Sequence, residues 1–160
     1  MAKREEDEIF MREALREAKQ AGEAGEVPVG AVIVYNGKII SRGRNAREHE
    51  KNALCHAEIA AIDGACRARG GWRLFDCTMY VTLEPCPMCA GAVINARLSR
   101  VVYGAKDARA GAFGSVINMC SYPLTSKPEL ECGILGDECA AILSDFFSRR
   151  RRLQSRLPSR

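Results

Sequence analysis

Apolar and polar positions repeat along the chain with two different periods, and the period changes at glycines and prolines. Apolar side chains recur every three or four positions over residues 5–21, which predicts a helix with one apolar face. That face contains Phe10, Ala14, Ala18 and Ala21. The next segment, VGAVIVYNGKIISRG (29–43), predicts a β-hairpin, because a β-branched run leads into an Asn-Gly turn.

Helices and strands continue to alternate after this hairpin. We expect a helix in HAEIAAIDGACRARGG (56–71), a strand in CTMYVTL (77–83) and a helix begun by proline in PMCAGAVINAR (87–97). A strand in RVVYG (100–104), a loop over 105–115 and a short strand in ELEC (129–132) follow. The last helix is expected from residue 137 to about 151, burying Cys139, Ile142, Leu143, Phe146 and Phe147. This alternation predicts βαβ units, and therefore an α/β fold with helices on both faces of a sheet.

Composition limits the number of domains. A chain of 160 residues that is 47% hydrophobic can bury one substantial core and is short for two. We therefore predict one domain over residues 1–152 and a basic C-terminal tail over 153–160. No apolar run approaches the length of a membrane-spanning helix, and the N-terminal MAKREEDE lacks the apolar stretch of a signal peptide. A cytoplasmic location is expected.

Charge is unevenly distributed along the chain. The segment 148–160, SRRRRLQSRLPSR, contains six arginines and no acid, so with a net charge of +4 the remaining residues carry a small net negative charge. Two interpretations of Arg149, Arg150 and Arg152 stay open at this point. They form either a solvated terminus or an arm that binds phosphates, which the planar guanidinium fits well.

The most distinctive chemistry lies in PCPMC (85–89), where two cysteines stand two residues apart. Such a pair can be a disulfide, a redox couple or half of a metal site. A cytosolic setting favours catalysis or metal binding, and the start of a helix favours the thiolate. Neither argument separates a redox couple from a metal site. We expect the other cysteines to be buried small apolar residues: Cys55, Cys66, Cys77, Cys120, Cys132 and Cys139.

A third ligand distinguishes the alternatives, and the chain has only two histidines. His49 lies in the polar segment REHEKN, which predicts a solvated loop position. His56 begins a helix, and two helix N-termini can bring His56, Cys86 and Cys89 around one metal ion. Three protein ligands and an open fourth position are typical of catalytic zinc, which lowers the pKa of a bound water. Glu58, which is not a ligand, could then accept and deliver protons.

The spacing of these residues resembles that of a known family. His56-Ala57-Glu58, followed after 26 residues by Pro85-Cys86-Pro87-Met88-Cys89, is similar to the signature of the cytidine and purine deaminase superfamily. The segments EVPVGAVIV, WRLFDCTMYVTLEPCPMCAGAVI, RVVYGAKDARAGAFGS and GILGDECAAILSDFF extend the match. Over almost all of residues 10–150, the chain resembles the tRNA-specific adenosine deaminases of bacteria within that superfamily.

This resemblance implies a three-layer α/β/α sandwich around a five-stranded mixed sheet, a homodimer and one zinc ion per subunit. It implies hydrolytic conversion of adenosine to inosine at the wobble position of a tRNA anticodon stem-loop. Glu58 would carry a proton to N1 of the adenine and then to the departing ammonia. Asn45 matches a residue that hydrogen-bonds the base, and Val29 and Ala57 match residues lining the pocket. Without the resemblance, Asn45 is typical of a loop cap and Val29 of a strand in the core.

The same resemblance implies contacts with RNA for several further residues. The candidate RNA contacts are Lys106, Asp107, Arg109, Arg149, Arg150 and Arg152. Each of the basic ones is also compatible with an ordinary solvated surface, and the sequence itself offers no reason for an acid at Asp107. Glu84 precedes a proline, and we expect it to organise the turn there rather than to react.

One departure from the family leaves the substrate open. Thr125 and Ser126 stand where the family usually carries an Asn-His pair that helps to hold the anticodon loop. A deaminase of a free base or nucleoside (guanine, cytosine or adenosine) is therefore an alternative with the same zinc motif. A non-catalytic zinc or RNA-binding subunit is a second alternative, disfavoured because such proteins tend to lose the acid that Glu58 supplies here.

Overall fold

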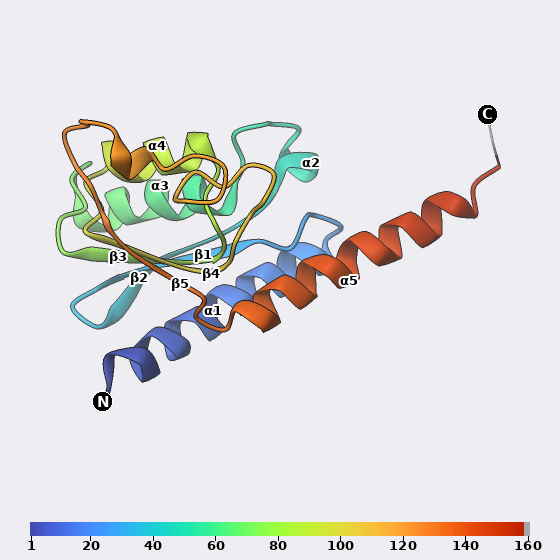
Figure 1. Cartoon of the computed structure of the whole chain (residues 1–160), viewed down its shortest axis with the longest axis horizontal. Coiled ribbons are helices and arrows are strands. Elements are labelled where there is room, and N and C mark those ends of the chain that lie inside the picture. Colours follow the sequence, from blue (N-terminus) through green and yellow to red (C-terminus); the bar gives the residue numbers. More distant parts are fainter. Residues whose placement is uncertain (159–160) are drawn as a thin grey trace.

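The computed structural model describes residues 1–158 and contains alternating helices and strands (Figure 1). None of the helices it describes combines the length and apolar character needed to cross a membrane. In chain order the elements are α1 (Lys3–Glu23), β1 (Gly30–Tyr35), β2 (Lys38–Arg44), α2 (Arg47–Glu50), α3 (Ala57–Arg69), β3 (Cys77–Leu83), α4 (Pro87–Asn95), β4 (Arg100–Ala105), the 3-10 helix η1 (Met119–Ser121), β5 (Glu129–Cys132) and α5 (Gly136–Ser155).

The five strands form one mixed sheet in the order β2-β1-β3-β4-β5. β1 is antiparallel to both β2 and β3, whereas β3, β4 and β5 run parallel to one another. Helices α3 and α4 cover one face of this sheet, and α1 and α5 cover the other (Figure 1). The predicted three-layer α/β/α sandwich with a five-stranded mixed sheet is therefore confirmed.

The central strands send alternate side chains to two separate cores, as the period of two requires. In β1, Ala31 and Ile33 join the core beneath α3 and α4, while Val32 and Val34 join the core beside α1 and α5. The predicted hairpin turn is confirmed: Asn36 and Gly37 both have positive φ, 50° and 73°. Two consecutive left-handed residues match the right-handed twist of the strands they connect.

The last helix differs from its prediction in length and in burial. It continues to Ser155, and of its expected apolar face only Cys139 is fully buried, while Phe147 is exposed. The cause is visible in Figure 1, where the second half of α5 extends past the edge of the sheet and has little to pack against. The division at residues 152/153 stays a prediction. The helix runs across it, and Ser159 and Arg160 of the predicted tail lie outside the described residues.

The prediction that all six remaining cysteines are buried is wrong in part. Cys77 and Cys139 are buried, three others are partly exposed (Cys55, Cys66 and Cys120), and Cys132 is exposed. Cys132 ends β5, a strand of four residues at the edge of the sheet. Apolar context in the sequence does not show that a strand is an edge strand, which has only one neighbour to cover it.

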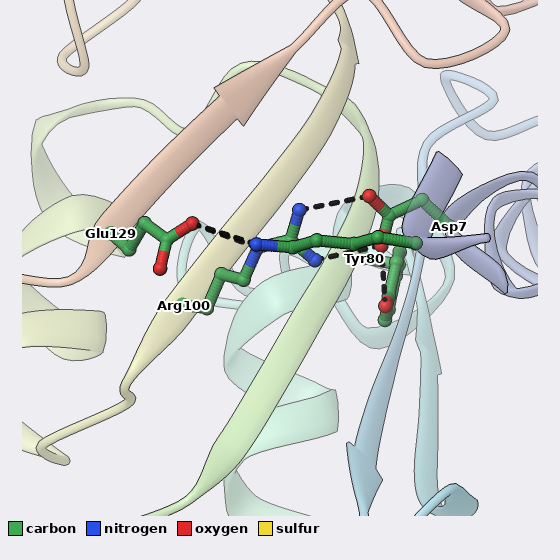
Figure 2. A network of polar contacts seen from close by, with 5 residues as sticks. Asp7, Tyr80, Arg100 and Glu129 are labelled. Carbon is green, nitrogen blue, oxygen red and sulfur yellow. Dashed lines mark hydrogen bonds and ion pairs between the residues drawn. The ribbon is translucent and has the colours of Figure 1, made fainter.

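A buried ion pair connects α1 to the sheet (Figure 2). Arg100 donates two hydrogen bonds to the Asp7 carboxylate, at 2.7 and 2.8 Å, and the Tyr80 hydroxyl donates a third at 2.8 Å. Glu129, on the exposed side, lies 3.6 Å from Nε of Arg100. Burial disfavours the ionised Asp7, but the bonds from Arg100 and Tyr80 outweigh it and hold the pKa of Asp7 below its ordinary value. Burial, together with the bond to Asp7, raises the pKa of the Tyr80 phenol.

Asp7→Asn should destabilise the protein by about 3 kcal/mol, because it leaves the buried Arg100 charge with only the exposed Glu129 as a counter-ion. Since the pKa of Asp7 is lowered on folding, its contribution is fully present above the unfolded value near pH 4 and is lost as the pH falls through the folded value. Urea unfolding at several pH values measures both effects. The variant should show a smaller loss of stability in acid than the parent.

Glu129→Gln is the matched control, because Glu129 is exposed and touches the same arginine from the solvent side. Its free energy of unfolding should change far less than that of Asp7→Asn. Equal losses in the two variants would contradict the assignment of the stabilisation to the buried pair.

Candidate metal centre

The two cysteines lie where β3 passes into α4. Cys86 is the N-cap residue of α4, Pro87 is the first helical residue and Cys89 lies in the first turn. Proline suits that position because its missing N–H has no partner in a helix anyway. The unpaired N–H groups at the start of α4 favour the thiolate form of Cys86, the residue that caps the helix.

His56 occupies the equivalent position at the start of α3. Its helix packs closely on β2, where Gly43 leaves no room for a side chain against the Ala57 carbonyl and the Ala61 backbone nitrogen. This close packing places the first turn of α3 beside the first turn of α4. The two helices approach the same end of the sheet, at the carboxyl ends of β3 and β4 (Figure 1).

The three donor atoms converge. Nδ1 of His56 lies 3.7 Å from Sγ of Cys86 and 3.5 Å from Sγ of Cys89, and all three atoms lie within 4.8 Å of one another. Sulfur and nitrogen ligands of a tetrahedral zinc ion stand about 3.6 Å apart, given the usual Zn–S and Zn–N bond lengths. The donor set and its spacing therefore fit zinc. His49 is exposed and is not part of this group, as expected for a solvated position.

The electrostatics of the two thiols also fit a cation. The hydrogen bond from Cys89, followed by that from His56, lowers the pKa of Cys86 to about 4. The hydrogen bond to Cys86 and burial raise the pKa of Cys89 well above its ordinary value. The hydrogen bond to Cys86 raises the pKa of His56. Two adjacent thiolates repel each other, and a divalent cation between them removes that repulsion.

Glu58 is the second residue of α3 and points into the same region. Its side chain is only 4% exposed, and burial raises the pKa of its carboxyl group. The neighbouring Cys89 thiol bonds to it, so the acid is next to a donor atom of the cluster. A buried carboxylic acid at this place can exchange protons with a molecule bound beside the three donors.

Asn45 is held by the protein on both sides of its amide. The carbonyl oxygen accepts the Ala57 N–H at 3.3 Å, and the amide nitrogen donates to the Val27 carbonyl at 3.2 Å. This agrees with the loop-cap interpretation, and it leaves one amide hydrogen for another partner. Val29 and Ala57 are buried in the core, and both are bonded to Asn45: the Asn45 N–H donates to the Val29 carbonyl at 3.2 Å, and the Ala57 N–H donates to the Asn45 side chain.

Glu26 is a structural residue that the sequence provides no means to identify. It is 4% exposed, and its carboxylate accepts the N–H groups of Glu48 and His49 at 3.0 and 2.9 Å. These bonds fix the single turn of α2, which forms in the segment REHEKN where we expected a solvated loop. The polar stretch EAGEVP does not predict that this acid is buried. Its hydrogen bonds to residues distant in the sequence account for the burial.

The loop after β4 carries three of the predicted RNA contacts. Lys106 and Arg109 are exposed, and Asp107 accepts the N–H groups of Arg109 and Ala110 at 2.9 and 3.2 Å. Asp107 therefore shapes its own loop, in the Asx turn that aspartate often forms with the backbone two residues on. The Glu84 carboxylate accepts N–H groups of the same loop, from Asp107 and Phe113. We expected Glu84 to organise the turn at Pro85, but the hydrogen bonds of its carboxylate go to this loop instead.

The remaining candidates lie away from the donor cluster. Arg149, Arg150 and Arg152 are exposed on α5, and the first two line a groove of about 820 Å³ between α1 and α5 that contains none of the zinc-motif residues. Thr125 lines a separate hollow of about 400 Å³ with Ile94 and Asn95 at the C-terminal end of α4. The structure thus places Thr125 at the opposite end of α4 from Cys86.

Replacing any one of the three donors should abolish tight zinc binding. For Cys86→Ser, Cys89→Ser or His56→Ala we expect zinc content to fall from about one ion per chain to below about 0.1, because two remaining ligands bind zinc weakly. Elemental analysis after dialysis under reducing conditions measures this, with Cys120→Ser as the control. Full zinc content in a donor variant, or a Cys86–Cys89 disulfide without zinc in the parent, would contradict the assignment.

Comparison with known proteins connects this geometry to a family. The cytidine and deoxycytidylate deaminase zinc-binding region matches residues 4–105. The chain is 49% identical to the tRNA-specific adenosine deaminase of Bacillus subtilis over 148 residues, which cover 92% of each protein. It is 43% identical to the tRNA-specific adenosine deaminase of Streptococcus pyogenes, covering 92% of this chain and 86% of that one.

Solved structures agree with the sequence matches. One, from work on A-to-I editing by tRNA:A34 deaminases at the wobble position, superimposes with a TM-score of 0.82 at 45% identity and covers 84% of this chain and 98% of its own. Guanine deaminase from Bacillus subtilis superimposes with a TM-score of 0.59 at 31% identity, covering 90% of this chain and 93% of its own. The chain therefore belongs to the zinc-binding cytidine and deoxycytidylate deaminase family.

Proposed function

We propose that this protein is a zinc-dependent hydrolase that converts adenosine to inosine at the wobble position of a tRNA anticodon. The observation that carries the proposal is the convergence of His56, Cys86 and Cys89 beside the buried acid Glu58. The similarity to tRNA-specific adenosine deaminases over nine-tenths of the chain supports adenosine in tRNA as the substrate. The lower similarity to guanine deaminase makes a free base less favoured.

The reaction exchanges the amino group at C6 of adenine for the oxygen of water and releases ammonia. When bound by His56, Cys86 and Cys89, zinc supplies the Lewis acidity that makes a water molecule nucleophilic near neutral pH. Glu58 transfers a proton to N1 of the ring and then a proton to the departing amine. Its burial excludes bulk solvent from these transfers, and its place in the first turn of α3 fixes its distance from His56.

We infer that the pocket for the base lies beside Asn45, Val29 and Ala57. The free amide hydrogen of Asn45 can donate to the base, while its other bonds to Ala57 and Val27 fix the direction of the side chain. Val29 and Ala57 contribute apolar contacts. An unpaired anticodon base can enter such a pocket without opening a duplex, which reduces the cost of binding.

Exposed basic residues on two elements are the proposed contacts for the anticodon stem-loop. Lys106 and Arg109 lie on the loop that begins at the carboxyl end of β4, the end of the sheet where α4 starts. Asp107 belongs to the same loop. Arg149, Arg150 and Arg152 add positive charge along the outer half of α5, where guanidinium groups can pair with phosphates.

We also propose that the protein is a homodimer located in the cytoplasm. The resemblance implies the dimer, and exposed apolar side chains at Val116, Tyr122 and Leu124 offer surface for a second copy. The location follows from the proposed substrate, since tRNA is used in protein synthesis there. Light scattering on the purified protein distinguishes a monomer from a dimer.

Substrate identity is tested by offering the zinc-loaded protein an anticodon stem-loop with adenosine at the wobble position, and separately adenine, adenosine, guanine, cytosine and cytidine. We expect inosine at the wobble position only, with release of ammonia. Turnover of a free base or nucleoside with an inert stem-loop would overturn the tRNA assignment while leaving the zinc chemistry in place. It would also give the Thr125/Ser126 departure a functional meaning.

Glu58→Gln should reduce turnover of the stem-loop by at least about 10³-fold, because the amide cannot transfer the protons. Zinc content and stem-loop affinity should stay close to those of the parent. Single-turnover assays, elemental analysis and filter binding measure the three quantities. Unchanged turnover in the variant would show that Glu58 is not the proton carrier and would favour a different acid.

Arg149→Gln combined with Arg150→Gln should weaken stem-loop binding about equally for different loop sequences. The salt dependence of binding should fall by about one counter-ion for each phosphate that the arginines no longer neutralise. Affinity measured between low and moderate salt gives this slope. Arg4→Gln is the control, since Arg4 is an exposed arginine in the first turn of α1, paired only with Glu8 among the described residues. Equal slopes in both variants would contradict a role for the α5 arginines.

A further inference from the structure

The residue that stands two positions before Cys86 is a deeply buried acid. Glu84 is 2% exposed, and its backbone N–H donates to the Ala105 carbonyl at 2.8 Å, joining the ends of β3 and β4. Within residues 1–158, no lysine, arginine or histidine forms an ion pair with its carboxylate. A buried carboxylate without a cation is costly unless hydrogen-bond donors surround it.

All of those donors come from a single loop, residues 106–116. The Glu84 carboxylate accepts the N–H groups of Asp107 at 3.2 Å, Phe113 at 3.1 Å and Ser115 at 3.2 Å, and it also accepts the Ser115 hydroxyl. These donors lie up to eight residues apart in the sequence, so the loop must curl around the carboxylate to present them together. Burial of the acid and the shape of the loop therefore depend on each other.

Further contacts reinforce this arrangement. The Ala112 N–H donates to the Pro85 carbonyl at 2.9 Å, and the Tyr103 hydroxyl donates to the Phe113 carbonyl at 3.2 Å. At Gly111 a side chain would collide with the Glu84 carboxylate and with the Asp107 carbonyl, so glycine leaves the space that the carboxylate occupies. The loop is thus bonded to the residues immediately before Cys86 by both side chain and main chain.

We propose that Glu84 is a positioning residue: it folds the 106–116 loop around its carboxylate and so fixes Lys106 and Arg109 relative to the Cys86 end of α4. The inference rests on the proposed function, because it assigns these two side chains to the RNA. The loop carries the groups that meet the stem-loop, and Glu84 connects them through Pro85 to the zinc ligand. Recognition of the RNA and placement of the metal are then joined by three consecutive residues.

Glu84→Gln tests this with little change in volume. The amide nitrogen donates where the carboxylate oxygen accepts, so it opposes at least one loop N–H. We expect backbone hydrogen exchange of Asp107, Phe113 and Ser115 to accelerate about tenfold or more, while zinc stays at about one per chain. The KM for the anticodon stem-loop should rise about tenfold, with kcat reduced by less than about threefold, since the reacting groups are untouched.

Two further variants complete the test of Glu84→Gln, one as a weaker perturbation of the same loop and one as a control. Ser115→Ala removes one of the donors and should change loop exchange and KM in the same direction by a smaller factor. Glu26→Gln is the matched control, because Glu26 is another buried carboxylate that accepts backbone N–H groups, here from Glu48 and His49. It should accelerate exchange at residues 47–50 and leave that of residues 106–116 unchanged.

The outcomes separate this proposal from the proposed function. Loop exchange needs no substrate, so it tests the role of Glu84 even if the parent protein fails to deaminate the stem-loop. Unchanged exchange and unchanged KM in Glu84→Gln would overturn the proposal. Loss of zinc and a rise in KM with unchanged loop exchange would also overturn it, by showing that Glu84 supports the metal site and not the loop. If Glu84→Gln does not fold, a Ser115→Ala protein with parental exchange and KM would be decisive against it.

Discussion

The structure depends on bringing two helix N-termini to one point at the end of a sheet. His56 and Cys86 are both N-cap residues, which have extended backbone conformations and side chains free to turn across the helix axis. Their donor atoms meet because α3 packs closely on the hairpin while α4 follows β3 directly. Neither helix could shift by one residue without separating the donors. The order of the strands and the close packing at Gly43 both help to bring the donor atoms at the starts of α3 and α4 together.

Each of the two segments that flank this point is tied to a buried acid. Glu26 binds the turn of α2, which precedes His56, and Glu84 binds the 106–116 loop next to Cys86. In both cases the carboxylate accepts backbone N–H groups, and within residues 1–158 it forms no ion pair with a basic side chain. Such an anchor fixes the main chain directly, so the exposed side chains on the segment remain available for other partners. At the far end of the sheet, Asp7 uses the more familiar arrangement, a buried pair with Arg100.

Local chemistry explains which features the sequence could predict. The Asn36-Gly37 turn, the proline that begins α4 and the period of apolar positions in α1 act over a few residues, and each predicted its element correctly. The Cys86-Cys89 pair is local in the same sense. His56 lies 30 residues earlier and was found because the chain has only two histidines, one of them at the start of a helix. Glu26 was different, because its partners lie 22 and 23 residues away and a lone acid in a polar stretch shows no period. The exposure of Cys132 and Phe147 depended on where the sheet ends, which no local pattern records.

The projection of α5 beyond the sheet affects how the protein meets a charged partner. A helix of 20 residues rises about 30 Å, and its outer half carries a run of arginines on a body whose remaining charge is slightly negative. An approaching polyanion meets the electrostatic field of the projecting helix before that of the rest of the protein. The distance over which this field acts is set by the Debye length, about 8 Å at physiological salt. The helix therefore enlarges the target for diffusional encounter. In kinetic terms, its arginines act on the association rate constant, and added salt slows capture before it weakens the bound complex.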